Sequence, residues 1–494
     1  MAMSAGGAGA FSRMFHDLLA LAGGERSPFY GKGIRPAGAR FRRAIFPKEK
    51  TVKRIVPFLV PWILLLAVPA FGQGPIDPVD VPQPTMKTLD QIEPRILIES
   101  LPYVIEKAGS YVLDGNAMLG STNEHGITVA ANDVVLDLGG FAMEGPTDGY
   151  GEPLSESGSA IYQEDGYRTL TVKNGSILKW NDQASEGVGM VQLLGTGNKI
   201  QNVTVRFCSR GIKMGPGALV QDCRVLNMAE EGETFGIWVG EGSVVKDCAV
   251  LTVQGGSAVG IGSDRACVFE RCTVISNRSF SGVSSYAFLV GSHGVVENCV
   301  VKGWGGGLTE YGFLLSDFTR AARCTAMACQ YGISLGERTE AIDSSASGCA
   351  VAGFYVHEGG ALIERCAAQD NQIGISVGHN NVVRGCIAMD NLNQGIEVRD
   401  ENNVIEGNAC NHNASSGIYV ATDANRIEGN HLVRNDYGLY FRYWDPTSHA
   451  KWNWAAKNTA RGNTTQNYFV GVSNSVAPIE PAGTFSNPWA NFEL

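Results

Sequence analysis

Residues 353–441 read GFYVHEGGALIERCAAQDNQI, GISVGHNNVVRGCIAMDNLNQ, GIEVRDENNVIEGNACNHNASS, GIYVATDANRIEGNHLVRNDY and GLYF when each line is begun at a glycine. The leading glycines are Gly353, Gly374, Gly395, Gly417 and Gly438, so successive units are 21, 21, 22 and 21 residues long. A fixed period of this size is typical of a solenoid, in which one unit cannot bury its apolar face alone and stacks on copies of itself.

Each unit predicts short strands and no helix. After its leading glycine comes an apolar–variable–apolar triplet such as Ile396-Glu397-Val398, whose period of two buries one face of a strand. A polar turn and a second apolar segment follow, around Ile405 in that unit. About 21 residues are too few for a strand–helix–strand unit, so we expect a coil of short strands paired in parallel.

The segments NNVIEGN at 402–408 and DANRIEGN at 423–430 resemble the repeats of right-handed parallel β-helix proteins of the pectin-lyase-like superfamily. The similar repeats occur in carbohydrate-binding proteins, sugar hydrolases and a periplasmic copper-accessory protein. The resemblance implies an all-β fold, a single-stranded right-handed parallel β-helix of roughly a dozen rungs with N- and C-terminal caps. It leaves the function open, because one fold carries many chemistries.

Residues 52–72 have the features of a secretory signal peptide. Lys53 and Arg54 precede an apolar core at 55–68, and Ala70-Phe71-Gly72 fits a cleavage site before Gln73. The core contains two prolines and is short against the roughly 20 residues of a spanning helix. We therefore expect no stable membrane span after cleavage; an uncleaved anchor is the alternative.

The remaining boundaries follow from composition and period. Residues 1–51 precede the signal peptide, although a signal peptide should begin a protein. We therefore expect that the start codon was assigned too far upstream. After the signal peptide we expect a Pro-rich linker at 73–88, then an N-terminal cap and first rung at 89–125 that open with a short amphipathic helix or a strand. The β-helix is expected at 126–445 and an aromatic C-terminal cap at 446–494.

Charge narrows the class of partner. Residues 73–494 hold 28 basic and 46 acidic residues, a net charge of −18. Such an acidic chain argues against nucleic acid and anionic membranes as partners. It also disfavours a polyanionic glycan, unless a cation mediates the contact.

Twelve cysteines in an exported protein would ordinarily predict disulfides. Here they recur at one place in successive rungs, at Cys223, Cys248, Cys272, Cys299, Cys324, Cys366 and Cys386, after which Asn408 and Asn430 take the same place. This pattern predicts a buried column at a bend. Disulfides between adjacent rungs and a reactive thiol are the alternatives, and the absence of a CxxC pair leaves a zinc site without support.

No catalytic motif of the pectate lyases, polygalacturonases or alginate epimerases is present: the chain has no Asp-Asp pair, no Gly-His-Gly and no Asp-Pro-His-Asp. Two outward columns remain as candidates. One lies in the turn five residues after each opening residue and contains Glu241, Asp317, Glu337, Glu358, His379 and Asp400. The other lies on the first strand and contains Trp238, Tyr355, Tyr419 and Tyr440.

These columns give two functional hypotheses beside the plain one of a solvated turn. The first is an exported protein, secreted, periplasmic or on the cell surface, that binds extracellular or cell-envelope polysaccharide through the aromatic column, with carboxylates binding hydroxyls or Ca²⁺. No other cofactor and no metal site is expected. The alternative is a polysaccharide lyase, C5-epimerase or glycoside hydrolase that uses Glu337, Glu358, His379 or Asp400.

The C-terminal tail is rich in aromatic residues, among them Trp452, Trp454 and Trp489. We expect these rings to cover the last rung, because the ends of solenoids need caps. A sugar-binding platform is the alternative, as is an acid/base pair formed by Asp445 and His449.

N-terminal sequencing tests the export hypothesis. We expect the precursor to begin near Val52 and the mature protein to begin at Gln73. Any peptide from residues 1–51 would contradict the assignment of the start, and a mature chain that retains 55–68 would contradict cleavage.

Overall fold

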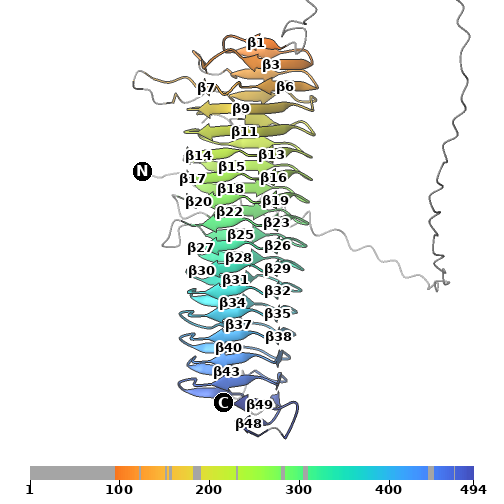
Figure 1. Ribbon diagram of the computed structural model, residues 1–494, viewed down its shortest axis with the longest axis vertical. Coiled ribbons are helices and arrows are strands. Elements are labelled where there is room, and N and C mark those ends of the chain that lie inside the picture. The colour runs from red at the N-terminus through yellow and green to blue at the C-terminus, as the bar shows by residue number, and fades with distance from the viewer. Residues whose placement is uncertain are drawn as a thin grey trace, which may run out of the picture. The chain divides into compact units, whose positions relative to one another are not determined.

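The computed structural model describes residues 95–494 except 122–123, 149, 151–152, 155–157, 182–190, 230–231, 280–283, 304–309, 443–449, 472 and 485. The predicted signal peptide, the linker at 73–88, Asp445 and His449 lie outside the described residues. The strands stack from β1 (Ile96–Ile98) at one end to β49 (Asn491–Glu493) at the other (Figure 1).

Each turn of the chain adds three short strands. In one turn these are β31 (Ala352–Val356), β32 (Leu362–Glu364) and β33 (Ala367–Gln369), and each pairs in parallel with its equivalent one turn later, β34 (Ile373–Val377), β35 (Val382–Arg384) and β36 (Ile387–Met389). This in-register parallel pairing is the coil predicted from the 21-residue period.

The first strand of every turn belongs to a 16-stranded sheet. Its strands are β2 (Tyr103–Ile105), β5 (Ile127–Val129), β8 (Ile161–Gln163), β10 (Val191–Leu193), β12 (Ile212–Met214), β15 (Glu233–Val239), β18 (Ser257–Ser263), β22 (Ser285–Val290), β25 (Tyr311–Leu315), β28 (Tyr331–Leu335), β31, β34, β37 (Ile396–Val398), β40 (Ser416–Val420), β43 (Tyr437–Phe441) and β46 (Gln466–Phe469). The predicted parallel β-helix of roughly a dozen rungs is thus confirmed; the 16 strands include those of the turns at both ends.

The other two strands of each turn belong to a 33-stranded sheet. The second and third strands of each turn lie on two faces of the coil. The two faces form one sheet because β9 (Thr171–Leu178) and β11 (Lys199–Arg206) are long enough to run along both. β11 pairs with β13 (Leu219–Gln221) over its first half and with β14 (Arg224–Ala229) over its second.

The core is a set of columns in which like residues stack on like. The inward position of the 16-stranded sheet is occupied by Phe288, Phe313, Ile333, Phe354, Ile375, Ile396, Ile418 and Leu439, all fully buried. The rings of Phe288 and Phe313 stack with their centroids 4.8 Å apart. Burying one such side chain stabilises the fold by about 1.5–3 kcal/mol, and the period repeats this gain in every turn.

Buried polar columns hold the bends between faces. The backbone N–H of Cys386 donates to Oδ1 of Asn408 at 2.9 Å, and the N–H of Asn408 donates to Oδ1 of Asn430 at 2.9 Å. Two further columns use asparagine in the same way, at Asn371, Asn391, Asn413 and Asn435 and at Asn381, Asn403, Asn425 and Asn453. Only the first of these three columns was predicted from the sequence.

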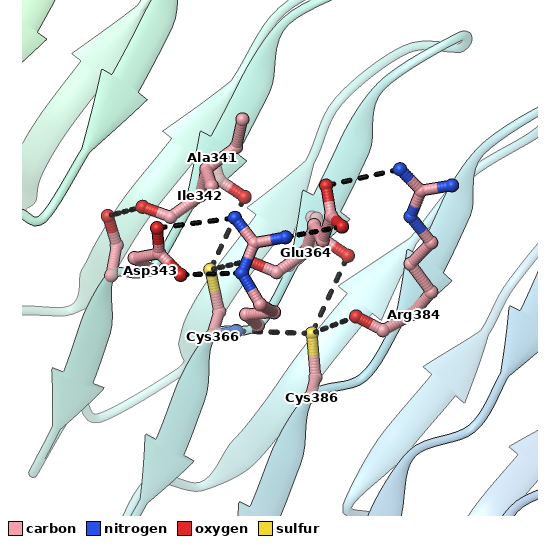
Figure 2. Close-up of polar contacts among 10 residues, drawn as sticks. Ala341, Ile342, Asp343, Glu364, Cys366, Arg384 and Cys386 are labelled. Atoms are coloured by element: carbon pink, nitrogen blue, oxygen red, sulfur yellow. Dashed lines mark hydrogen bonds and ion pairs between the residues drawn. The ribbon is translucent and has the colours of Figure 1, made fainter.

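The predicted cysteine column continues the first asparagine column toward the N-terminus, with Ser344 between Cys324 and Cys366. Figure 2 shows Cys366 and Cys386 on successive turns, where the Cys366 N–H donates to Sγ of Cys386 at 3.4 Å. All twelve cysteines are free and buried. Burial raises the pKa of the Cys324 thiol to about 11, so this thiol is protonated and unreactive at neutral pH.

Ion pairs cover the outside of the same bend. Arg365 bridges Asp343 and Glu364, and Arg384 continues the row at 3.1 Å from Glu364 (Figure 2). Such exposed pairs contribute about 0–1 kcal/mol each. The fold therefore depends on the buried columns beneath them.

Both ends of the stack are built of strands. Residues 95–113 contain β1, β2 and β3 (Gly109–Leu113), which favours the strand over the short helix as the opening element of the cap. The turns also continue past residue 445, because β45 (Thr459–Arg461) pairs with β42 (His431–Val433) and β46 pairs with β43. Within the described part of the chain, no helix is long and apolar enough to cross a membrane.

Removing one asparagine tests the buried columns. In Asn408→Ala the Cys386 N–H loses its acceptor and the Val383 carbonyl loses a donor at 3.0 Å. We expect a loss of about 1–3 kcal/mol in the free energy of unfolding, measured by urea denaturation. Asn408→Cys is the matched control. It should lose less stability, because the preceding turn carries a cysteine, Cys386, at the same position of the column. Equal stability of Asn408→Ala and the wild type would contradict the role of the column.

Candidate functional site

The outward side of the 16-stranded sheet carries the predicted aromatic column. Strand pairing places Trp238, Gly262, Leu289, Leu314, Ser334, Tyr355, Ser376, Glu397, Tyr419 and Tyr440 one above another. Trp238, Tyr355, Tyr419 and Tyr440 thus share one face, as the sequence predicted. Trp238, Tyr355 and Tyr419 are separated from one another by other residues of the column, so each has different neighbours.

Most of the aromatic rings stack on one another. Tyr419 stacks on Tyr440 with centroids 5.6 Å apart, and Tyr440 stacks on Phe469 at 4.8 Å. A second column contains Tyr286, Tyr311 and Tyr331 at 5.5 and 5.1 Å. The ring faces used in these stacks are covered by the neighbouring ring, on both sides for Tyr440 and on one side for Tyr419. Sugar binding by these two tyrosines stays a prediction.

Trp238 differs because the next turn has no side chain above it. A Cβ added at Gly262 would lie 2.4 Å from the indole of Trp238, which shows that the ring covers this glycine. Its indole hydrogen-bonds to Asp264, whose pKa is raised by burial and by Glu241. The ring therefore lies along the sheet.

The predicted carboxylate column lies in the turn that follows the 16-stranded sheet. His379 and Asp400 are exposed, with Nδ1 and Oδ2 3.8 Å apart. Glu337 pairs with Arg338 at 3.3 Å, and its backbone N–H donates to Asp317 at 2.8 Å. Glu358 is exposed. Among the described residues, no three His, Cys, Asp or Glu side chains are grouped to hold a metal ion.

One cluster brings together polar groups that the stacked rings do not. We call it the Tyr–His–Arg cluster; it consists of Ser334, Tyr355, His357 and Arg399. Arg399 reaches back across two turns, donating from one terminal nitrogen to the Tyr355 hydroxyl at 2.9 Å and from the other to the Val356 carbonyl at 2.6 Å. Its guanidinium carbon lies 4.4 Å from the centroid of the Tyr355 ring.

Small residues make this reach sterically feasible. The turn between His357 and Arg399 has Ser376 and Gly378 at the outward positions. Arg399 forms no ion pair with the described residues, and its buried Nε atom has no hydrogen-bond partner among them. A partly buried guanidinium in this state is suited to an anionic ligand.

His357 is held in place on the opposite side of Tyr355. Its Nε2 lies 2.6 Å from the hydroxyl of Ser334, and its ring meets the Tyr355 ring edge-on with centroids 4.8 Å apart. His357 is exposed at the surface, but partial desolvation of its ring and the positive charge of Arg399 lower its pKa. The imidazole is therefore neutral at pH 7, and Nδ1 can accept a proton when Nε2–H donates to Ser334.

The cluster also has one carboxylate beside it. Glu397 lies two residues before Arg399 on β37 and accepts a hydrogen bond from Ser376 at 2.7 Å. The site thus offers a cation, a carboxylate, a phenol and a neutral imidazole within three successive turns. Such a set can bind hydroxyls and a carboxylate, and it can move a proton.

Sequence reasoning identified Tyr355 and missed His357, Arg399 and Ser334. The column that follows the 16-stranded sheet contains Gly215, Gly240, Gly291, Gly336 and Gly378. A histidine and an arginine in a column of glycines were a signal that could have found the cluster. The predicted carboxylate column instead used the next residue along, where Glu358 and Asp400 lie.

Comparisons with known proteins agree with the fold. The family described as "Right handed beta helix region" matches residues 311–465, which fits the predicted resemblance to the pectin-lyase-like superfamily. A search of curated proteins finds no match.

Several solved structures are similar. One is the A-module of a mannuronan C-5 epimerase from Azotobacter vinelandii, with 12% identity and a TM-score of 0.36 over 70% of this chain and 91% of that one. A periplasmic alginate epimerase has 12% identity and a TM-score of 0.28 over 79% and 78%. The catalytic unit of an α-1,3-glucanase from Streptomyces thermodiastaticus has 12% identity and a TM-score of 0.28 over 75% and 64%.

The lowered pKa of His357 predicts a dependence of stability on pH. Because the unfolded chain takes up this proton at the ordinary pKa of about 6.5 and the folded chain does so only at lower pH, stability is lost as the pH falls below 6.5. His357→Asn should weaken this loss, measured as the melting temperature between about pH 7.5 and about pH 5. The imidazole resonance of His357 can be assigned by its absence from the variant. A pKa of this resonance above the ordinary value for histidine would contradict the prediction.

Proposed function

We propose that this is an exported protein that binds polysaccharide on the outer side of the 16-stranded sheet, with the Tyr–His–Arg cluster as the point of contact. The observation that carries the proposal is Arg399, a partly buried cation held by the Tyr355 hydroxyl and the Val356 carbonyl on the outer side of the sheet, with no ion pair to the described residues. The export part rests on the signal sequence at 52–72.

A sugar polymer suits the arrangement of groups. The Tyr355 hydroxyl, the His357 ring and the Glu397 carboxylate offer donors and acceptors for hydroxyl groups. Tyr355 and His357 lie on one turn and Glu397 lies two turns further along the same sheet, so a chain of sugar residues that follows the sheet can meet all three. A linear polymer along the sheet fits such a repeating surface better than a single small molecule does.

Arg399 favours a sugar residue that bears a carboxylate. The acidic chain as a whole repels polyanions, so a cation has to mediate such a contact. The guanidinium is this cation, because its remaining N–H groups can bind a carboxylate and Tyr355 fixes its position.

A second candidate function, lyase or C5-epimerase activity, is favoured by the neutral His357. If Arg399 holds the carboxylate of a uronate residue, the acidity of the adjacent C–H rises, and Nδ1 of His357 can accept that proton. In elimination, the electron pair of the broken C–H bond forms a C=C bond and expels the glycosidic oxygen. In epimerisation, a proton returns to the opposite face of the same carbon.

Replacing Arg399 tests the binding proposal. We expect Arg399→Gln to weaken binding of polyuronates such as polygalacturonate or alginate by about 10-fold or more, the value of one charge-assisted contact. Binding is measured by affinity electrophoresis of purified residues 73–494. Arg434→Gln is the matched control, because Arg434 is exposed on the other sheet, and it should bind as the wild type does.

Product analysis of the same samples separates binding from catalysis. New unsaturated ends or an altered epimer ratio, lost in His357→Asn while binding persists, would establish the enzyme. Retention without new products would leave a binding protein. Unchanged polyuronate binding by Arg399→Gln, or no binding by the wild type, would refute the proposed site.

A further inference from the structure

Three tryptophans lie together near the C-terminal end of the 33-stranded sheet. Trp454 begins β44 (Trp454–Ala456), which pairs with β41 (Arg426–Glu428) on one side and β47 (Ser475–Val476) on the other. Trp452 is 73% exposed and Trp489 is 52% exposed. By contrast, Tyr468 and Phe441 are buried. The expectation that the tryptophans cover the last rung stays a prediction.

The three rings line two adjoining clefts. One has a volume of about 450 Å³ and is lined by Trp454, Ser475, Val476, Ala477 and Trp489. The other has about 520 Å³ and is lined by Ala424, Asn425, Arg426, Trp452, Trp454 and Trp489. Because Trp454 and Trp489 belong to both, the two hollows adjoin and form one shallow surface open to solvent, which we call the tryptophan groove.

The rings in the groove do not stack on one another. Trp454 and Trp489 meet at 65° with centroids 6.5 Å apart, in contrast to the near-parallel rings of the 16-stranded sheet. Arg426 lies over Trp454 at 5.1 Å, and Lys457 lies over Trp489 at 4.1 Å. Each cation lies over one face of its ring.

One buried carboxylate fixes both cations. Glu428 pairs with Lys457 at 2.9 Å and with Arg426, and Lys457 followed by Arg426 lowers the pKa of Glu428. The cations are thereby held against the indoles, and one of their two positive charges is neutralised. The groove thus combines aromatic surfaces with a single net positive charge.

Trp452 is exposed at a backbone position that disfavours it. Its φ is +54°, the left-handed region in which bulky residues are rare. Strand register places Asn402 and Ala424 at the same corner of the preceding turns, also with positive φ. Asparagine tolerates this conformation far better. Phe318 lies at the same corner of an earlier turn, also exposed and with a positive φ, and its ring stacks on His293 with centroids 5.1 Å apart. Trp452 instead lines a hollow beside Trp454 and Trp489.

The chemistry of the groove identifies its ligand. A pyranose ring has C–H groups on its faces and hydroxyls on its rim, which matches indole faces bordered by the polar groups of Ser475 and Arg426. An anionic membrane or polyanion would require unpaired cations, and Glu428 pairs both of these. We propose that the tryptophan groove binds neutral sugar residues of a polysaccharide, as a second site separate from the Tyr–His–Arg cluster.

Replacing Trp452 by asparagine tests the groove without harming the fold. Purified residues 73–494 are run in affinity electrophoresis with hydroxyethyl cellulose, galactomannan and dextran, and indole fluorescence is recorded in parallel. We expect the wild type to be retarded by at least one of these neutral glycans with a change in fluorescence. Trp452→Asn should lower that affinity by 5-fold or more, while its melting temperature stays equal or rises.

Two control variants distinguish the groove from exposed rings in general and from the Tyr–His–Arg cluster. Phe318→Asn changes an exposed ring at the equivalent corner of another turn and should bind as the wild type does. Arg399→Gln should also keep neutral-glycan binding, so failure of the Tyr–His–Arg proposal leaves this one standing. The proposal is overturned if the wild type binds none of the three glycans or if Trp452→Asn binds them unchanged. It is equally overturned if Trp452→Asn abolishes self-association or binding to vesicles and leaves glycan binding intact.

Discussion

In-register parallel stacking is the constraint on which the rest of this structure depends. Every residue lies between its equivalents in the turns before and after, about 4.8 Å away. Each side chain must therefore pack against similar side chains in the two adjacent turns. Inside, this condition is met by phenylalanine, isoleucine and valine columns. At the bends it is met by asparagine, whose amide both accepts from one backbone N–H and donates to a carbonyl, so that buried polar groups are satisfied without water.

The same constraint governs the outside of the molecule. Aromatic residues in one column stack face to face, as Tyr419, Tyr440 and Phe469 do, and their faces are then occupied. Candidate binding groups arise where a column is interrupted. Gly378 and Ser376 interrupt it beside His357 and let Arg399 reach Tyr355 two turns away, and Trp452 places a bulky ring at a corner where the two preceding turns carry Asn402 and Ala424.

The two candidate sites differ in the charge that each leaves uncompensated. At the Tyr–His–Arg cluster, Arg399 has no carboxylate partner among the described residues, and the nearby His357 is neutral. At the tryptophan groove, Glu428 pairs both cations. The first arrangement suits an acidic sugar and the second a neutral one. A heteropolymer containing both kinds of residue would satisfy the two sites together.

The sequence by itself determined the architecture, because a 21-residue period with alternating apolar residues has one compact solution. It also determined the cysteine and asparagine column and the shared face of Trp238, Tyr355, Tyr419 and Tyr440, which follow from counting along the repeat. Only the tertiary structure decided which of these residues are available to a ligand. Whether a ring stacks on its neighbour, or an arginine crosses a glycine to a tyrosine two turns away, depends on side-chain directions and on the unequal lengths of the turns. For the same reason only the tertiary structure shows that Trp452, Trp454 and Trp489 line two adjoining hollows.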